Sequence, residues 1–91
     1  MVKKVIDCYA QWCGPCKALA NTFKAVSEDE KFSGVEFKKV DIETDEGEEY
    51  VEKFMIRGVP TVLFLDENDN LISKSVGIMS QDELSNKILN S

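Results

Sequence analysis

Apolar and polar positions along the chain change between the spacing of a strand and the spacing of a helix. Short apolar or β-branched runs predict strands at residues 5–10, 35–42, 61–65 and 71–76. Apolar residues three or four positions apart predict helices at residues 13–27, at residues 47–55 and from residue 80 onward. The resulting order, β-α-β-α-β-β-α, indicates an α/β domain built around one mixed sheet.

The connections between these segments support this order. A helix separates the first two strands, so the right-handed crossover rule makes them parallel. The polar cluster at residues 66–70 predicts an antiparallel hairpin, and Ser80 with Glu83 three residues later predicts a capping box. The three helices would bury apolar stripes against both faces of a four-stranded sheet. These stripes are Leu19, Ala20, Phe23 and Val26, then Tyr50, Val51 and Phe54, and finally Leu84, Ile88 and Leu89.

Length and charge narrow the class of protein. The 91 residues, 43% of them hydrophobic, predict a single domain over residues 1–91 with one modest core. The formal net charge of −6 argues against nucleic-acid binding, which depends on basic surfaces. The N-terminal segment holds too few apolar residues for a signal peptide, and no segment approaches the roughly 18 apolar residues of a membrane span. We therefore expect a cytoplasmic protein that binds neither nucleic acid nor membranes.

The strongest chemical signal is the sequence Trp-Cys-Gly-Pro-Cys-Lys at residues 12–17, where the first predicted helix begins. Cys13 and Cys16 lie one helical turn apart, a spacing typical of a redox pair. The unpaired N–H groups and the dipole at a helix start favour the thiolate of Cys13, which makes it the predicted attacking sulfur. Pro15 has the fixed φ that suits a first helical turn, and Gly14 leaves the space above the sulfurs open. These residues predict thiol–disulfide exchange.

The cysteine pair also allows two other interpretations. A structural disulfide would close a loop of about four residues and stabilise the fold by only about 2 kcal/mol. A closed zinc site needs four ligands, whereas the chain has no histidine and only Cys8 as a further cysteine. A cluster bridged between two copies is the remaining metal alternative. We expect no bound metal or cofactor, and we interpret Cys8 as a small buried hydrophobic residue in a reducing compartment.

Several separated motifs resemble the thioredoxin family from about residue 5 to residue 89. Residues 12–17 match the active-site motif of that family, and Asp7 and Lys39 fall where it has a buried acid and a partner lysine. The run Arg-Gly-Val-Pro-Thr at residues 57–61 is similar to its cis-proline loop, and Val76 with Gly77 is similar to the end of its last strand. The resemblance implies the strand order 2-1-3-4, a minimal thioredoxin-like core without the usual first strand and first helix.

The resemblance implies an enzyme that reduces protein disulfides through a mixed disulfide. Cys13 would attack the substrate, and Cys16, expected to be the more buried of the two, would release the product. Burial would raise the pKa of Asp7 and make it the base for Cys16, while Lys39 would moderate that shift by pairing with Asp7. A strand-end acid that faces water is the competing interpretation of Asp7. A binding module without catalysis and a glutathione-dependent, glutaredoxin-like reductase are the alternative functions.

The resemblance also implies a cis bond between Val59 and Pro60, although X-Pro bonds in general favour trans. A cis bond would place the Val59 backbone where an extended substrate strand could pair with it, whereas a proline that merely starts a strand is the alternative. The expected docking surface is shallow and mostly apolar, although core packing is a competing role for Ile42 and Ile78. It consists of Trp12, Gly14, Pro15, Ile42, Val59, Val76, Gly77 and Ile78. The implied partners are proteins with disulfides and a thioredoxin-reductase-type electron donor, with the chain acting as a monomer.

Overall fold

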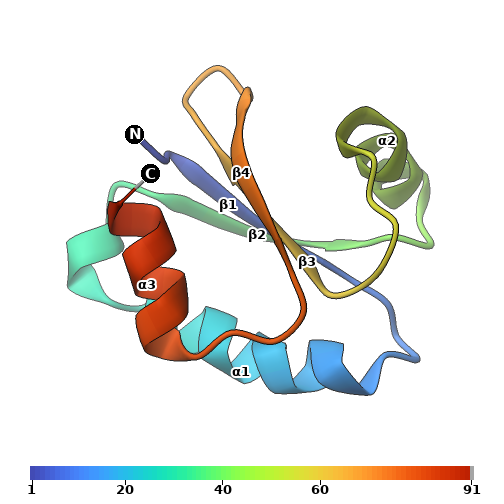
Figure 1. Ribbon diagram of the computed structural model, residues 1–91, viewed down its shortest axis with the longest axis horizontal. Coiled ribbons are helices and arrows are strands. Elements are labelled where there is room, and N and C mark those ends of the chain that lie inside the picture. Colours follow the sequence, from blue (N-terminus) through green and yellow to red (C-terminus); the bar gives the residue numbers. More distant parts are fainter. Residues whose placement is uncertain (91) are drawn as a thin grey trace.

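A four-stranded sheet separates helices on its two faces (Figure 1). The computed structural model describes residues 1–90, and its strands lie in the order β2-β1-β3-β4. The strands are β1 (Lys4–Tyr9), β2 (Glu36–Asp41), β3 (Thr61–Leu65) and β4 (Leu71–Val76). The helices are α1 (Gly14–Ser27), α2 (Asp45–Phe54) and α3 (Gln81–Leu89), with a short 3-10 turn, η1, at Glu30–Phe32. The predicted α/β class, the strand order and the three helices are confirmed.

The strand pairing places β1 and β3 at the centre of the sheet. β1 pairs with β2 in parallel and with β3 antiparallel, and β3 pairs antiparallel with β4. The predicted hairpin is confirmed, because β3 and β4 are consecutive antiparallel strands. In its turn, the Asp66 carboxylate accepts hydrogen bonds of 2.8 and 3.0 Å from the N–H groups of Asn68 and Asn70. Both central strands are buried on their two faces, as strands flanked by other strands and covered by helices must be.

The core has one cluster on each face of the sheet. α1 and α3 cover one face, and α2 covers the other (Figure 1). The α1 side buries a cluster that includes Val5, Leu19, Phe23, Val62, Phe64 and Leu84. The α2 side buries Ile6, Cys8, Val40, Phe54, Ile56, Leu63 and Leu65. The predicted burial of Cys8 is confirmed. Within residues 1–90, no helix has both the length and the apolar character needed to cross a bilayer.

α2 begins two residues earlier than residue 47, where the apolar spacing placed its start. Its N-cap is Thr44, whose Oγ1 accepts a 3.1 Å hydrogen bond from the Gly47 N–H. The first turn carries Asp45, Glu46 and Glu48, which the positive end of the helix dipole stabilises. The apolar stripe starts only after this acidic turn, so hydrophobic spacing alone missed it.

The capping box predicted at the start of α3 is present, whereas one residue predicted to be buried at its end is exposed. Ser80 Oγ accepts a 3.1 Å hydrogen bond from the Glu83 N–H, and Glu83 Oε1 accepts one of 3.2 Å from the Ser80 N–H. Leu84 and Ile88 lie one turn apart and face the sheet, as expected. Leu89 was predicted to be buried but is 58% exposed. It follows Ile88 by one position, which rotates it by about 100° around the helix and away from the sheet.

The close approach of α2 to the end of β2 generates a stability prediction. Gly47 is buried, and a Cβ atom there would overlap the Asp41 carbonyl oxygen and the Ile42 backbone. We expect Gly47→Ala to lower the free energy of unfolding by about 1–3 kcal/mol, because overpacking against backbone outweighs the better helix propensity of alanine. Urea unfolding followed by circular dichroism measures the change. Gly34→Ala is the matched control, since a Cβ there meets no atom within 4 Å; a stabilised Gly47→Ala variant would contradict the prediction.

Candidate redox site

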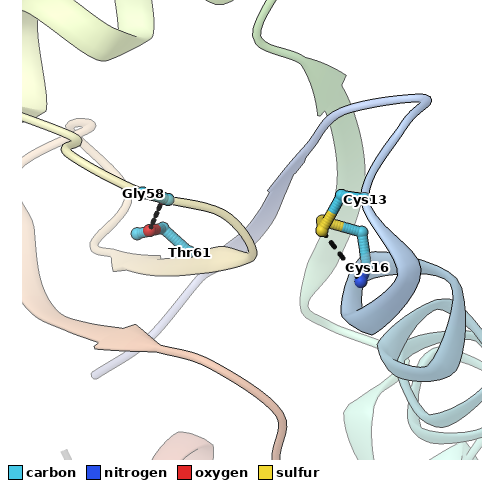
Figure 2. Close-up of a disulfide and its surroundings, with 4 residues drawn as sticks. All are labelled: Cys13, Cys16, Gly58 and Thr61. Carbon is cyan, nitrogen blue, oxygen red and sulfur yellow. Dashed lines mark hydrogen bonds between the residues drawn. A yellow bond between two sulfur atoms is a disulfide. The ribbon is translucent and has the colours of Figure 1, made fainter.

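The two cysteines lie at the start of α1, shortly after the end of β1. Cys13 is the N-cap residue of α1, and its Sγ accepts a 3.1 Å hydrogen bond from the Cys16 backbone N–H (Figure 2). The two sulfurs form a disulfide, with the Cα atoms 5.2 Å apart. Pro15 lies in the first turn of α1, and nothing lies within 4 Å of the position where a Cβ of Gly14 would be. The helix start thus holds both sulfurs in one geometry and leaves the space beside Gly14 open.

Both cysteines are buried in the disulfide form. Their exposed fractions are 4% for Cys13 and 3% for Cys16, so the expected difference in burial is absent. The two residues belong to one buried cluster with Ala10, and half-buried Val59 packs against that cluster. In the reduced state, an anionic sulfur at the N-cap would be stabilised by the Cys16 N–H and by the helix dipole. The local geometry therefore favours Cys13 as the thiolate.

Asp7 lies in the middle of β1, on the face that α1 covers. Its side chain is fully buried, and neither carboxylate oxygen has a hydrogen-bond partner among residues 1–90. Loss of solvation raises the pKa of Asp7 from 3.8 to about 6, while the charge of Lys39 acts in the opposite direction. The interpretation of Asp7 as a water-facing acid is thus wrong, because β1 is a central strand. A carboxyl with this pKa accepts and releases protons near neutral pH.

Lys39 is the register partner of Asp7 on β2, so the two residues lie on the same face of the sheet. No ion pair joins the two side chains within residues 1–90, however, and the Lys39 ammonium lies 4.7 Å from the centroid of the Tyr9 ring. A hollow of about 140 Å³ borders Tyr9, Cys16 and Lys39. Tyr9 was not predicted as a site residue, although an aromatic residue two positions after Asp7 on the same strand face was a usable signal. Lys39 therefore acts on Asp7 through space rather than by contact.

A loop before β3 faces the disulfide from the other side. The Val59–Pro60 peptide bond is cis, and Figure 2 shows the segment between Gly58 and Thr61 turned toward the two cysteines. Thr61 Oγ1 donates a 2.6 Å hydrogen bond to the Gly58 carbonyl, and the Gly77 N–H donates one of 2.9 Å to the Pro60 carbonyl. Gly77 has a φ of 97°, which favours glycine over residues with a Cβ. These bonds fix the loop to the end of the β3–β4 ladder.

Exposed apolar side chains lie among the residues expected to form the docking surface. Trp12, Val76 and Ile78 are 67%, 69% and 59% exposed, so core packing is not the role of Ile78. Ile42 and Val59 are half-buried and pack against the cysteines, and Ile42 also packs on the α2 side of the core. Ile42 therefore serves the core at least as much as the surface. Large apolar side chains exposed close together are typical of a protein-binding surface.

The site combines two cysteines in disulfide geometry at a helix start, a buried carboxyl with a raised pKa and an exposed apolar rim. The pair can take up two electrons by breaking its S–S bond and release them by forming it again, which needs no other cofactor. Fold and site together define a thiol–disulfide oxidoreductase of the dithiol type.

Comparisons with known proteins agree with this class. The Thioredoxin family model matches residues 2–90, and the chain belongs to the thioredoxin family. It is 39% identical over 82 residues to a thioredoxin of Mycoplasmoides gallisepticum, covering 90% of this chain and 77% of that one. It is also 39% identical over 85 residues to thioredoxin-1 of Caenorhabditis elegans, covering 93% and 69%. The protein is therefore a protein-disulfide reductase of this family.

Solved structures give the same result. Thioredoxin of Malassezia sympodialis superposes with a TM-score of 0.82 at 34% identity, covering 96% of this chain and 72% of that one. The short form of thioredoxin f from spinach chloroplast also superposes with a TM-score of 0.82, at 33% identity, covering 98% and 76%. The four-stranded sheet and the helices of this chain thus match the larger part of a thioredoxin domain.

The burial of Asp7 generates a pH-dependent stability prediction. The pKa of Asp7 is raised in the folded state, so the ionised carboxyl lowers the free energy of unfolding. This penalty has its full size above pH 6 and disappears as the pH falls to about 4. We expect Asp7→Asn to raise the free energy of unfolding at pH 7 by up to about 3 kcal/mol, with the gain shrinking toward pH 4. Urea titrations of the oxidised protein measure it, because the disulfide keeps Cys13 and Cys16 from titrating.

Glu52→Gln is the control for this prediction, because it removes a carboxylate from an exposed position on α2. Its effect on the free energy of unfolding should stay within about 0.5 kcal/mol at both pH values. A gain for Asp7→Asn that is the same at pH 4 and pH 7 would show that Asp7 is not ionised at a cost in the folded state.

Proposed function

We propose that this chain reduces disulfides of partner proteins by a two-step exchange between Cys13 and Cys16. The observation that carries the proposal is the position of Cys13 Sγ, which accepts the Cys16 N–H at the start of α1 and lies within bonding reach of Cys16. The Cys13 thiolate attacks one substrate sulfur and forms a mixed disulfide, and the other substrate sulfur leaves as a thiolate. Cys16 then attacks Cys13 Sγ and displaces the second substrate thiolate. The substrate gains two electrons and two protons, and the chain ends as the disulfide.

Asp7 acts as the base for the second step. Cys16 must lose its proton before it attacks, and a buried carboxyl with a pKa of about 6 can accept that proton directly or through one water. Lys39 lowers the pKa of Asp7 from a distance and so helps to keep most of the carboxyl ionised at neutral pH. The hollow that borders Cys16 and Lys39 supports this role, because it gives solvent a route to the same side of the pair.

The substrate docks as an extended segment across the disulfide. The exposed side chains of Trp12, Val76 and Ile78 supply apolar contact. The cis Val59–Pro60 bond supports pairing between the Val59 backbone and the substrate backbone, since the loop is turned toward the cysteines. Gly14, Pro15 and Gly77 leave room for the substrate chain, because none of them carries a long side chain.

The remaining partners follow from the chemistry. Each turnover leaves the cysteine pair oxidised, so a thioredoxin-reductase-type enzyme must supply two electrons for the next one. A reducing compartment such as the cytoplasm suits this cycle and the free thiol of buried Cys8. The net charge of −6 supports a protein partner rather than nucleic acid or an anionic membrane surface, and we propose that the chain works as a monomer.

Reduction of insulin by dithiothreitol tests the proposed activity. We expect the chain to accelerate insulin precipitation at pH 7, and we expect Cys13→Ser to abolish the acceleration because the attacking sulfur is gone. Cys8→Ala is the matched control, because Cys8 is buried on the α2 side of the core and should leave the rate unchanged. Turnover that survives in Cys13→Ser, or that needs glutathione in place of dithiothreitol, would contradict the proposal.

Single-turnover kinetics test the role of Asp7. We expect Asp7→Asn to form the mixed disulfide at the normal rate but to release the product at least about 10-fold more slowly at pH 7, because a general base is lost. Stopped-flow fluorescence of Trp12, the single tryptophan, follows both steps. Cys16→Ser provides the reference for complete loss of release, since it should accumulate the mixed disulfide. Equal release rates for Asp7→Asn and the unmodified chain from pH 6 to pH 8 would remove Asp7 from the mechanism.

A further inference from the structure

A groove lies beside the docking surface, on the α2 face of the sheet. It measures about 430 Å³ and runs between the end of β4 and the segment that connects α2 to β3. Its apolar lining includes Met55, buried Ile56 and Val76, and two of these side chains are strongly exposed, Met55 at 63% and Val76 at 69%. The groove therefore offers apolar surface that is open to solvent.

The groove is continuous with the reaction site. Thr61 and Gly58 line it, and they flank the Val59–Pro60 bond on its two sides. Thr61 is also the register partner of Val76, and the next residue, Gly77, donates its N–H to the Pro60 carbonyl. A polypeptide segment that pairs with the Val59 backbone thus reaches the groove within a few residues of its attacked cysteine.

The charges on the groove are opposite in sign to the net charge of the chain. Arg57 and Lys74 line it, and no carboxylate lines it within residues 1–90. The chain as a whole carries 17 acidic and 11 basic residues. The local potential is therefore positive although the protein is acidic, and at physiological ionic strength only charges within about 8 Å act strongly on one another.

Lys74 and Arg57 differ in their contacts within the chain. The Lys74 ammonium donates hydrogen bonds to the carbonyls of Phe54 and Met55, at 3.1 and 3.5 Å, and so closes the C-terminal end of α2. Arg57 is exposed and makes no hydrogen bond or ion pair with any of the residues that the structure describes. It is the only arginine of the chain, and its guanidinium is free for a partner.

We propose that Arg57 selects protein disulfides whose flanking sequence carries carboxylates. An extended substrate segment lies along the groove, its apolar side chains on Met55 and Val76, and a glutamate or aspartate near the attacked cysteine pairs with the Arg57 guanidinium. A lysine or arginine at the same place is repelled. This inference rests on the proposed function, since it concerns the choice of substrate for the same exchange reaction.

Three synthetic disulfide peptides test the preference. Each is the symmetric dimer of a short peptide in which the cysteine is flanked on both sides by glutamate, glutamine or lysine. The reduced chain is mixed with each peptide at 150 mM salt, and the second-order rate constant is followed by Trp12 fluorescence. Because every variant meets the same peptides, differences in the intrinsic reactivity of the peptides cancel in the comparison. Sedimentation at the same concentrations reports whether a second copy occupies the groove.

We expect Arg57→Gln to lower the glutamate-to-lysine rate ratio by about two- to fivefold, the range expected for exposed charge pairs. Arg57→Lys should keep most of the ratio. Lys24→Gln is the matched control, because it removes one exposed charge from α1, outside the groove, and should leave the ratio unchanged.

The other outcomes overturn the proposal in distinguishable ways. An unchanged ratio in Arg57→Gln, an equal fall in Lys24→Gln, or an equal slowing of all three peptides would show that Arg57 does not select substrates by charge. A dimer that dissociates in Arg57→Gln would assign the groove to a second copy. If Arg57→Gln slowed only the reduction of the oxidised chain by its reductase, the groove would be assigned to that enzyme. If neither insulin nor any peptide is reduced by the unmodified chain, the proposed function fails together with this inference, whereas reduction of insulin without a charge preference refutes the inference alone.

Discussion

The hydrogen bond from the Cys16 N–H to Cys13 Sγ fixes the reactive sulfur to the backbone, and the rest of the site is arranged around it. Strand pairing explains how the second half of the site comes to face this sulfur. β1 and β3 are antiparallel neighbours, with Cys8 opposite Thr61. The C-terminal end of β1 and the N-terminal end of β3 therefore lie side by side at the same end of the sheet. The segment before α1 and the segment that carries Pro60 are therefore brought together by topology, although about 45 residues separate them in the sequence.

The same central strand places a carboxyl where solvation is lost. Asp7 shares β1 with fully buried Val5 and Ile6, and its oxygens have no hydrogen-bond partner within residues 1–90. A fold of this kind is stable by only about 5–15 kcal/mol, so one uncompensated carboxylate is a substantial cost. Lys39 could compensate it by direct contact but lies against the Tyr9 ring instead. The arrangement keeps the carboxyl reactive near neutral pH, which full pairing with a lysine would prevent.

Much of this architecture could be predicted from the sequence because it depends on periodicity. Alternation along β2 placed Lys39 on the same strand face as Phe37, and the structure has both residues on that strand. Helical spacing identified the buried residues of α1 and α3 apart from Leu89, which is exposed. Features that depend on flexible side chains or on competing backbone states could not be derived in this way. The position of the Lys39 ammonium follows from many rotatable bonds, and the start of α2 depends on a polar cap rather than on apolar spacing. The cis state of Val59–Pro60 was expected only from the family resemblance, since the general preference of X-Pro bonds is trans.

The acidic and basic residues of the chain lie in different places, so the net charge of the chain and the charge near the disulfide have different effects. The carboxylates of residues 41–52 lie mainly on α2 and on the segment before it, where they stabilise the helix start and keep the surface hydrated. The connection from α2 to β3 and the adjoining end of β4 carry only cations along the groove. Because salt screens charges that are far apart, a partner that has reached the disulfide experiences mainly the nearest charges. Discrimination between substrates at the moment of exchange is therefore a local property of the Arg57 side of the site, whereas the overall acidity of the chain governs solubility and the rate of encounter.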